Sequence, residues 1–151
     1  MILKRRIATS SDTEFVRISH HAAYRDVVWR QFGAWDEALQ DHLFEEKWIP
    51  HQFEIVLCDG NPCGFLLVED RSDHISISEI VIAPQFQGRG IGSRLLNEEM
   101  QRGREAKSPL RLQVLRENRA IELYRRLGFK ECGTTETHIR MVWEDCEQHA
   151  G

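Results

Sequence analysis

The feature that most constrains the fold of this chain is a glycine-rich segment between a strand-like and a helix-like stretch. It reads Pro84-Gln85-Phe86-Gln87-Gly88-Arg89-Gly90-Ile91-Gly92-Ser93. Its glycines permit positive φ angles and close approach of another molecule to the backbone. The amides of such a loop and of the first helical turn lack intrachain partners, and the helix dipole adds positive charge there. The segment therefore predicts an anion site suited to a pyrophosphate.

Other phosphate-binding motifs fit this segment less well. A Walker A loop ends in Gly-Lys-Ser/Thr, which the segment lacks. A dinucleotide-binding fingerprint needs a third glycine where this chain has Ser93, and it belongs to the first strand of a parallel unit. Here the preceding strands are separated by tight turns, which favour an antiparallel meander. A structural turn without a ligand stays open as an alternative.

Hydrophobic periodicity predicts a mixed α/β fold, in which strands first run together and then alternate with helices. The pattern Ser11 to Glu14 resembles a capping box, so a helix should begin there and reach about Trp29. Asp36 is the expected cap of a second helix over 37–47, and further helices are expected at 90–106 and 119–127. The expected strands are residues 4–8, 53–58, 63–69, 74–83, 110–115, 129–132 and 137–143.

The strand at 74–83 shows an irregular pattern. Ile75 and Ile77 share one face, whereas Ile80 and Ile82 fall in the opposite phase. One extra residue near Ser78-Glu79 would bring all four isoleucines onto one face, which predicts a β-bulge. A strand buried on both faces is the alternative.

Size, charge and cysteine spacing argue for a single-domain protein and against nucleic-acid binding, membrane and zinc-binding classes. The 151 residues predict one domain, residues 1–151, and the net charge of −4 argues against a nucleic-acid partner. No apolar run approaches the about 20 residues of a membrane helix, and the first residues show no signal-peptide pattern, so a cytoplasmic location is expected. The cysteines form no zinc pattern, which predicts free thiols and no metal. His20-His21 is interpreted as a surface pair, because adjacent helical residues point apart.

Two stretches in order resemble the GNAT acetyltransferase family. Gln87-x-x-Gly90-x-Gly92 is similar to the Gln/Arg-x-x-Gly-x-Gly/Ala pyrophosphate loop of that family. Downstream, residues 112–129 resemble its strand, asparagine and helix segment ending in Leu-Tyr-x-x-Leu-Gly-Phe, with Asn118 and Tyr124 at the matching positions. The resemblance spans roughly residues 53–129.

The resemblance implies the GNAT fold, a central and mostly antiparallel sheet that is splayed between its fourth and fifth strands and flanked by helices. It implies that acetyl-CoA binds in the splay as cosubstrate. Asn118 matches an asparagine near the CoA arm, and Tyr124 matches the family's proton donor at the cofactor. The backbone groups implied in CoA binding are those of Ile80, Val81 and Ile82 for the pantetheine arm and of Gln87, Gly88, Arg89, Gly90, Ile91, Gly92 and Ser93 for the pyrophosphate.

Acyl transfer from a thioester to an amine needs a base, because an ammonium has no lone pair. Glu79 is the expected base, since burial in an apolar strand would raise its pKa. His74, His138 or a chain of waters are the alternatives. A backbone amide near Val81 or Ile82 is the expected donor to the developing oxyanion.

The leaving thiolate needs an acid, and Tyr124 is protonated at neutral pH. These features predict an acetyl-CoA-dependent N-acetyltransferase that transfers the acetyl group directly to a primary amine. A non-catalytic acyl-CoA-binding or sensor module is the alternative.

The acceptor stays open between a peptide N-terminus, a lysine, a polyamine, an amino acid and an antibiotic. Trp29, Trp35 and Trp48 lie where the family builds its acceptor site, and most of them are expected in the core. No membrane partner is expected. The chain is expected to be a monomer or a homodimer, with its C-terminal strand available for pairing between subunits.

Overall fold

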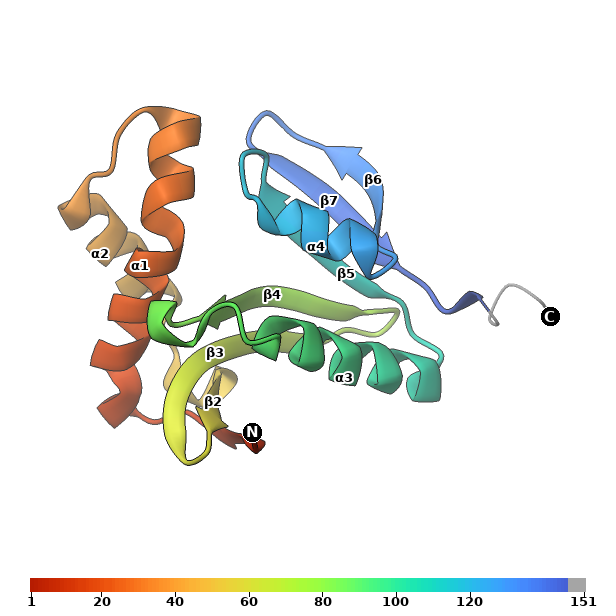
Figure 1. Ribbon diagram of the computed structural model, residues 1–151. Helices are drawn as coiled ribbons and strands as arrows, with labels where there is room; N and C mark the ends of the chain where they lie inside the picture. The colour runs from red at the N-terminus through yellow and green to blue at the C-terminus, as the bar shows by residue number, and fades with distance from the viewer. Residues whose placement is uncertain (147–151) are drawn as a thin grey trace. The chain divides into compact units, whose positions relative to one another are not determined.

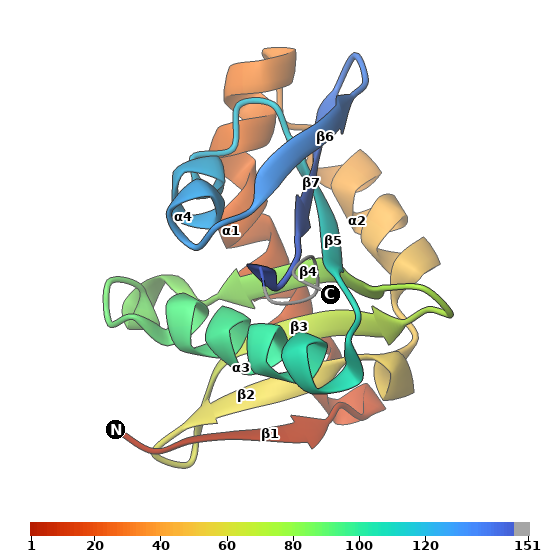
Figure 2. The same cartoon turned by 90° about the vertical axis from the view of Figure 1, so that its right-hand side faces the viewer.

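The computed structural model describes residues 1–146 and consists of a mixed sheet with helices, as expected. Its strands have the hydrogen-bonded order β1-β2-β3-β4-β5-β7-β6 (Figures 1 and 2). The strands are β1 (Leu3–Ile7), β2 (Glu54–Cys58), β3 (Asn61–Asp70), β4 (Ile75–Ile82), β5 (Leu110–Leu115), β6 (Lys130–Thr134) and β7 (His138–Trp143). The α-helices are α1 (Thr13–Phe32), α2 (Glu37–Lys47), α3 (Ile91–Ala106) and α4 (Ala120–Arg126). Short 3-10 turns are η1 (Ser10–Asp12), η2 (Pro50–Gln52) and η3 (Pro84–Phe86).

The pairing of β4 with β5 is the one parallel step among the described ladders. It joins Ile75 to Leu110 and Ser76 to Arg111, whereas β1–β2, β2–β3, β5–β7 and β6–β7 pair antiparallel. No further β4–β5 pair occurs in residues 1–146. The mostly antiparallel sheet that splits between its fourth and fifth strands is therefore confirmed.

The chain divides into two compact units, one of residues 1–67 with 79–91 and the other of residues 68–78 with the chain from 92 onward. The first unit buries a core between α1, α2 and strands β2 to β4, made of Ala8, Val16, Phe44, Phe53, Ile55, Phe65 and Val81. Gly64 allows β3 to approach β4, because a Cβ there would overlap the carbonyl oxygen of Val81.

The first helix begins differently from the predicted capping box. The Thr9 amide donates a 2.9 Å hydrogen bond to the Asp12 carboxylate, so the reciprocal cap lies two residues earlier and η1 precedes α1. The Arg6 guanidinium of β1 donates two hydrogen bonds of 2.8 and 2.9 Å to the same carboxylate, which connects the start of the helix to the sheet. These bonds lower the pKa of Asp12. The helix continues to Phe32, three residues beyond the expected end, where Gly33 adopts φ 77°.

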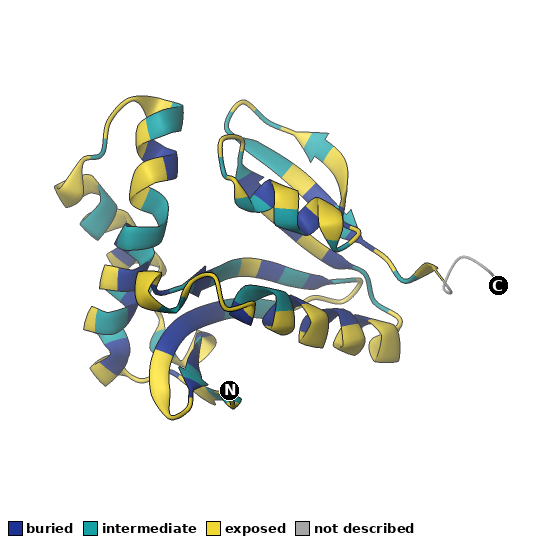
Figure 3. Cartoon of the chain, viewed as in Figure 1, coloured by how far each residue is buried: buried dark blue, intermediate teal, exposed yellow. Residues whose placement is uncertain are grey.

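In the second unit, burial alternates along β5 with Leu110, Leu112 and Val114 buried (Figure 3). The strand β7 lies between β5 and β6 and pairs with both. Its two edges are therefore occupied, and the expectation that the C-terminal strand is available to another subunit is wrong.

The predicted bulge in β4 is supported by its hydrogen bonds to β3. The Arg71 amide donates to the carbonyl oxygen of His74, and the Ala83 amide donates to that of Cys63, so β4 holds one residue more than β3 between these two pairs. The extra residue in β4 is what the sequence pattern predicts, and this part of the prediction is confirmed.

Ile75, Ile77 and Val81 are buried, whereas Ile80 and Ile82 are half-buried. Val81 lies in the core of the first unit, whereas the Ile82 side chain lies beside Gly64 on the other face of the sheet.

The other predicted elements match the observed ones within about two residues, which is the usual uncertainty of element ends. Within residues 1–146, the helices are too short or too polar to cross a bilayer.

Candidate functional site

The glycine loop connects β4 to α3, as the sequence indicates. Gly88 and Gly90 adopt φ angles of 79° and 76°, a region that glycine enters without steric cost. A Cβ added at Gly88, Gly90 or Gly92 would meet no atom within 4 Å, so the space beside this backbone is open. These glycines therefore leave room for a ligand close to the main chain.

The loop is anchored at both ends. The Gln87 side-chain amide donates a 3.0 Å hydrogen bond to the carbonyl oxygen of Ile82, at the end of β4. The Ile91 side chain is buried at the start of α3. The Arg89 guanidinium lies 5.2 Å from the centre of the Phe86 ring. The Gln87 backbone amide donates to the carbonyl oxygen of Pro84, so the amides to consider for an anion are those that follow it in the loop.

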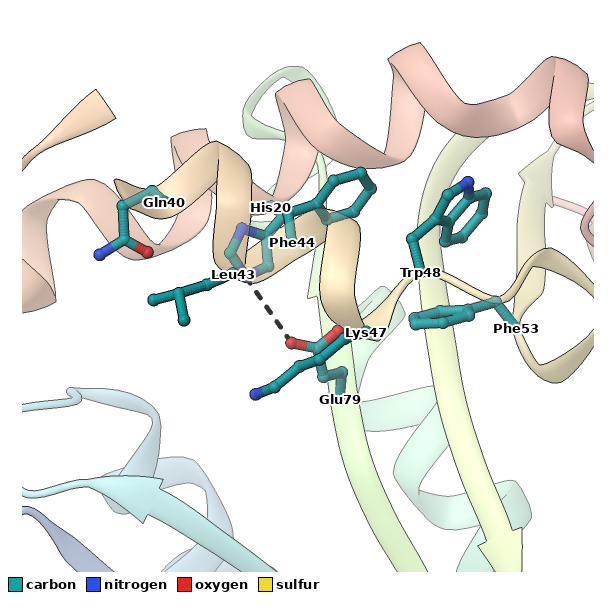
Figure 4. Close-up of a pocket in the computed structure, with 8 residues that line it drawn as sticks. All are labelled: His20, Gln40, Leu43, Phe44, Lys47, Trp48, Phe53 and Glu79. Carbon is teal, nitrogen blue, oxygen red and sulfur yellow. Dashed lines mark ion pairs between the residues drawn. The ribbon is translucent and has the colours of Figure 1, made fainter. Parts of the chain in front are cut away.

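Glu79 lines a pocket of about 100 Å³ in the first unit (Figure 4). The pocket walls come from α1, α2, β4 and the segment around η2. They are formed by His20, Gln40, Leu43, Phe44, Lys47, Trp48, Phe53 and Glu79. Trp48 stacks on Phe44 with 5.6 Å between ring centres, and it contacts Phe53 at 4.9 Å with the two ring planes tilted by 53°. The Glu79 carboxylate thus shares the pocket with three aromatic rings and with the polar side chains of His20, Gln40 and Lys47.

Burial raises the pKa of Glu79 to about 7, and the positive charge of Lys47 opposes this rise. The Glu79 side chain is 17% exposed, so the carboxyl still reaches the pocket. The expectation that burial on this strand raises its pKa is confirmed. A carboxyl with this pKa exchanges a proton near neutral pH, which is what a general base requires.

The interpretation of His20-His21 as a surface pair is wrong. The His21 side chain is 3% exposed and that of His20 is 15% exposed. Their Nδ1 atoms lie 3.0 Å apart, and His21 Nε2 lies 2.7 Å from Asp41 Oδ1 of α2. The prediction assumed that α1 buries one face, but α2 packs on it as well and covers a second.

His20 also faces Glu79, with 3.8 Å between Nε2 and Oε1, the contact dashed in Figure 4. Burial, together with the charges of His21 and Lys47, lowers the pKa of His20 to about 4. His20 is therefore neutral at neutral pH, and its contact with Glu79 is not an ion pair. The adjacent-histidine dipeptide and the lone Asp41 carry no sequence signal that links them to Glu79.

Among residues 1–146, one set of side chains has the spacing of a metal site. His21, Glu37 and Asp41 place one ligand atom each within 4.8 Å of one another. Cationic side chains already occupy these carboxylates: Arg25 pairs with Glu37 at 3.3 Å and Arg17 with Asp41 at 3.6 Å. We assign the set to ion pairing, because a metal would compete with two guanidinium groups.

Asn118 and Tyr124 belong to the second unit. The Asn118 side-chain oxygen accepts a 2.9 Å hydrogen bond from the Ala120 amide, which caps α4. Tyr124 is 6% exposed and packs edge-on against Phe129 at 5.7 Å. Burial raises the pKa of its hydroxyl to about 12, so it keeps its proton at neutral pH.

The predicted pantetheine-binding residues and the predicted tryptophans differ in how far they are buried. Ile80 and Ile82 are half-buried, while the Val81 side chain lies in the core, so only its backbone groups are free to act at a ligand. Among the tryptophans, Trp29 is exposed and the other two are half-buried, so the expectation that most lie in the core is wrong. Of the three, only Trp48 lines the pocket.

The two alternative bases lie elsewhere. The Nδ1 atom of His74 bonds Asp73 at 2.7 Å, and that of His138 bonds Thr137 at 2.7 Å. Neither is among the residues that line the Glu79 pocket. The described geometry therefore favours Glu79 over either histidine as the titrating group of this pocket.

Comparison with known proteins shows which proteins this chain resembles. An uncharacterized N-acetyltransferase of Methanocaldococcus jannaschii is 35% identical over 112 residues, which are 64% of this chain and 48% of that protein. Spermidine N(1)-acetyltransferase of Escherichia coli K12 is 35% identical over 80 residues, 50% of this chain and 43% of that protein. The chain thus spans about half the length of these relatives.

The structure of the PaiA N-acetyltransferase of Thermoplasma acidophilum in complex with coenzyme A has the same fold. It aligns with a TM-score of 0.78 at 19% identity and covers 96% of this chain and 100% of that one. The sequence model of the acetyltransferase (GNAT) domain matches residues 50–131, which contain β4, the glycine loop and Tyr124. Because that match covers more than half of the chain, this protein belongs to the GNAT acetyltransferase family.

Proposed function

We propose that this protein is an acetyl-CoA-dependent N-acetyltransferase that transfers the acetyl group directly to a primary amine. The observation that carries the proposal is Glu79, a carboxyl in an aromatic pocket whose pKa is raised to about 7. Glu79 lies on β4, the strand that leads into the glycine loop. A proton acceptor for an ammonium and a loop suited to an anion thus follow one another along the chain.

The cosubstrate is proposed to bind at the glycine loop. Its pyrophosphate would accept hydrogen bonds from the amides of residues 88–93, because the Gln87 backbone amide already donates to Pro84. The dipole of the 16-residue helix α3 would add to the attraction. The open space beside Gly88, Gly90 and Gly92 fits this role. The backbone groups of residues 80–82 are proposed to hold the pantetheine arm, as in the family pattern, with Asn118 near the CoA arm.

The chemistry assigned to the protein has three parts. Glu79 removes a proton from the acceptor ammonium, because only the neutral amine has a lone pair to attack with. A β4 amide at Val81 or Ile82 donates to the thioester oxygen as negative charge develops there. Tyr124 gives its proton to the leaving sulfur, and its raised pKa keeps that proton available at neutral pH.

The first acceptors to examine are polyamines, because the E. coli relative is named for spermidine. The Glu79 carboxylate and the rings of Phe44, Trp48 and Phe53 would attract one ammonium of a polyamine, since cations are attracted both to negative charge and to ring faces. Lys47 also lines the pocket and would repel a second ammonium placed beside it.

The test is a screen of acetyl-CoA turnover over polyamines, amino acids, lysine peptides, peptide N-termini and aminoglycoside antibiotics. Release of free CoA thiol and the acetylated product are measured together. We expect at least one amine to be acetylated, with the rate lost in Glu79→Gln. Binding of CoA by calorimetry without turnover of any amine would contradict the proposal and indicate an acyl-CoA-binding module.

A further inference from the structure

The proposed reaction must release one proton per turnover. The acceptor nitrogen starts with three protons as an ammonium and ends with one as an amide. A carbon–nitrogen bond forms, the carbon–sulfur bond breaks, and the sulfur leaves with one of the two lost protons. The second proton first rests on Glu79, whose side chain is 17% exposed. Glu79 must lose it to solvent before the next cycle.

Three side chains form a hydrogen-bonded line that begins beside Glu79. His20 Nε2 lies 3.8 Å from the Glu79 carboxylate, and His20 Nδ1 lies 3.0 Å from His21 Nδ1. His21 Nε2 then lies 2.7 Å from Asp41 Oδ1. The Asp41 side chain is 38% exposed, so the line runs from the pocket to solvent.

The carboxylate at the end of this line fixes both tautomers. Asp41 accepts a proton from His21 Nε2, which leaves His21 Nδ1 as an acceptor when the ring is neutral. His20 Nδ1 must then donate to it, because two bare nitrogens 3.0 Å apart would repel each other. His20 Nε2 is left with a lone pair that faces Glu79.

Glu79 and His20 Nε2 are two acceptors that face each other across 3.8 Å, too far for a direct bond. A water placed about 2.9 Å from each could accept a proton from Glu79 and donate one to His20 Nε2. The bridge completes a continuous path for a proton from Glu79 to His20.

We propose that His20, His21 and Asp41 form a proton relay that returns Glu79 to its basic state by carrying its proton to the surface. The step moves one proton into His20 Nε2 while the Nδ1 proton passes to His21 and the His21 Nε2 proton passes to Asp41. No oxidant or reductant is involved. This inference rests on the proposed function, because Glu79 has a proton to lose only if it first takes one from the acceptor ammonium.

The relay works without a lasting charge on either ring. A concerted transfer adds and removes one proton at each histidine, so the charge of each ring is the same before and after it. After the transfer each ring carries its proton on the other nitrogen. Each histidine regains its starting tautomer by rotation of the ring or by proton exchange with water. Asp41 is suited to the exit because the hydrogen bond from His21 lowers its pKa, so it gives the proton up to water.

The surrounding charges act on the two ends of the line. At the inner end, Lys47 of α2 lowers the pKa of both His20 and Glu79. At the outer end, Arg17 of α1 pairs with Asp41, and Glu37 of α2 lies near His21. The remaining direct neighbours are rings, those of Tyr24 and Phe44 beside His20 and those of Trp35 and Phe44 beside His21.

The first test is Asp41→Asn. The Asn oxygen still accepts the His21 hydrogen bond, so the tautomers are kept, but an amide does not take up a proton at neutral pH. We expect kcat to fall roughly 10-fold with little change in KM, less than the about 10²–10⁴-fold that follows loss of a direct acid–base group. Asp26→Asn is the matched control, because Asp26 is an exposed α1 carboxylate paired with Arg30.

The second test is His20→Ala with added imidazole, which can enter the space left by the ring. We expect a lower kcat that rises with imidazole concentration, a response that a purely structural role would not give. The control is His42→Ala, because His42 is an exposed histidine paired with Glu46 on the outer side of α2. Circular dichroism and thermal unfolding check that each variant is folded.

The outcomes separate this inference from the proposed function. A wild-type rate in Asp41→Asn, or a His20→Ala rate that does not rise with imidazole, overturns the relay while acetyl transfer stands. A wild-type protein that acetylates no amine overturns the proposed function. In that case nitrogen NMR of the histidine rings still tests the tautomers that the relay requires. A proton on His20 Nδ1 at neutral pH supports the relay, and a proton on His20 Nε2 overturns it.

Discussion

The Gln87 side-chain amide donates a hydrogen bond of 3.0 Å to the carbonyl oxygen of Ile82. This bond closes the turn between β4 and the glycine loop, five residues apart in sequence. The family pattern places a glutamine or arginine at this position, and in this structure the side chain holds the loop to the strand. The loop amides are thereby presented with a fixed backbone, which lowers the entropy lost when an anion binds.

We expect Gln87→Ala to weaken CoA binding by about 2- to 10-fold, the worth of one such hydrogen bond. Calorimetric titration with CoA measures the change. Gln85→Ala is the control, because Gln85 is exposed in the same loop and its side chain makes no recorded hydrogen bond in the described part of the chain. Equal affinities for the two variants would show that the Ile82 bond does not order the loop.

A side chain at Gly92 is expected to abolish CoA binding without harming the fold. Gly92 has an ordinary φ and an added Cβ would meet no atom within 4 Å, so Gly92→Val should leave the unfolding free energy nearly unchanged. Loss of affinity would then come from overlap with the bound pyrophosphate. Gly90→Val differs, because Gly90 has φ 76° and valine is strained there with or without ligand. An unchanged CoA affinity in Gly92→Val would refute the loop assignment.

Tyr124→Phe tests the proposed acid. Removing only the hydroxyl keeps the ring packed on Phe129, so stability and CoA affinity should change little. Loss of general acid catalysis typically costs about 10²–10⁴-fold, and kcat should fall by that order. Full kcat in Tyr124→Phe, under conditions in which chemistry limits the rate, would assign the residue to the core alone.

The pH dependence of the reaction is expected to follow Glu79. Its carboxyl is the base only when ionised, so kcat/KM should fall as the pH drops below about 7. Glu79→Gln should remove most of the activity at every pH. A limb at about 7 that persists in the residual activity of Glu79→Gln would assign the titration to another group.

The raised pKa of Glu79 also affects the stability of the protein. Ionisation above about pH 7 favours catalysis by Glu79 but lowers the free energy of unfolding. The folded-state pKa of Glu79 is raised above the ordinary value of 4.5, so its stability contribution is present at low pH and is lost as the pH rises through about 7. The raised pKa corresponds to a penalty of roughly 3 kcal/mol above that pH. Glu79→Gln should therefore raise the melting temperature at pH 8 by several degrees and change it less at pH 5. Equal effects at both pH values would contradict a buried carboxyl.

Gly64→Ala is expected to destabilise the protein by about 1–3 kcal/mol, because the new Cβ would overlap the Val81 carbonyl oxygen across the sheet. Gly133→Ala is the matched control, since its Cβ would only touch the Arg140 side chain at 3.7 Å. Chemical unfolding compares the two variants. If both lose the same stability, then β3 and β4 can separate to admit the methyl group.

Local patterns in the sequence were sufficient for the elements and for the chemical groups of the loop. Hydrophobic period, turn residues and the glycine spacing are properties of neighbouring residues, which is why β5 and the start of α3 were predicted within one residue. Glu79 was found for the same reason, as a charge inside an apolar strand.

The sequence by itself thus determined the α/β class, the glycine loop and the candidate base. Only the tertiary structure decided that β7 lies between β5 and β6, that Val81 faces the core, and that His20 and His21 connect Glu79 with Asp41. Each of these depends on which elements pack on which. Two adjacent histidines are buried because α2 packs on a second face of α1. The periodicity of α1 alone does not specify a second buried face.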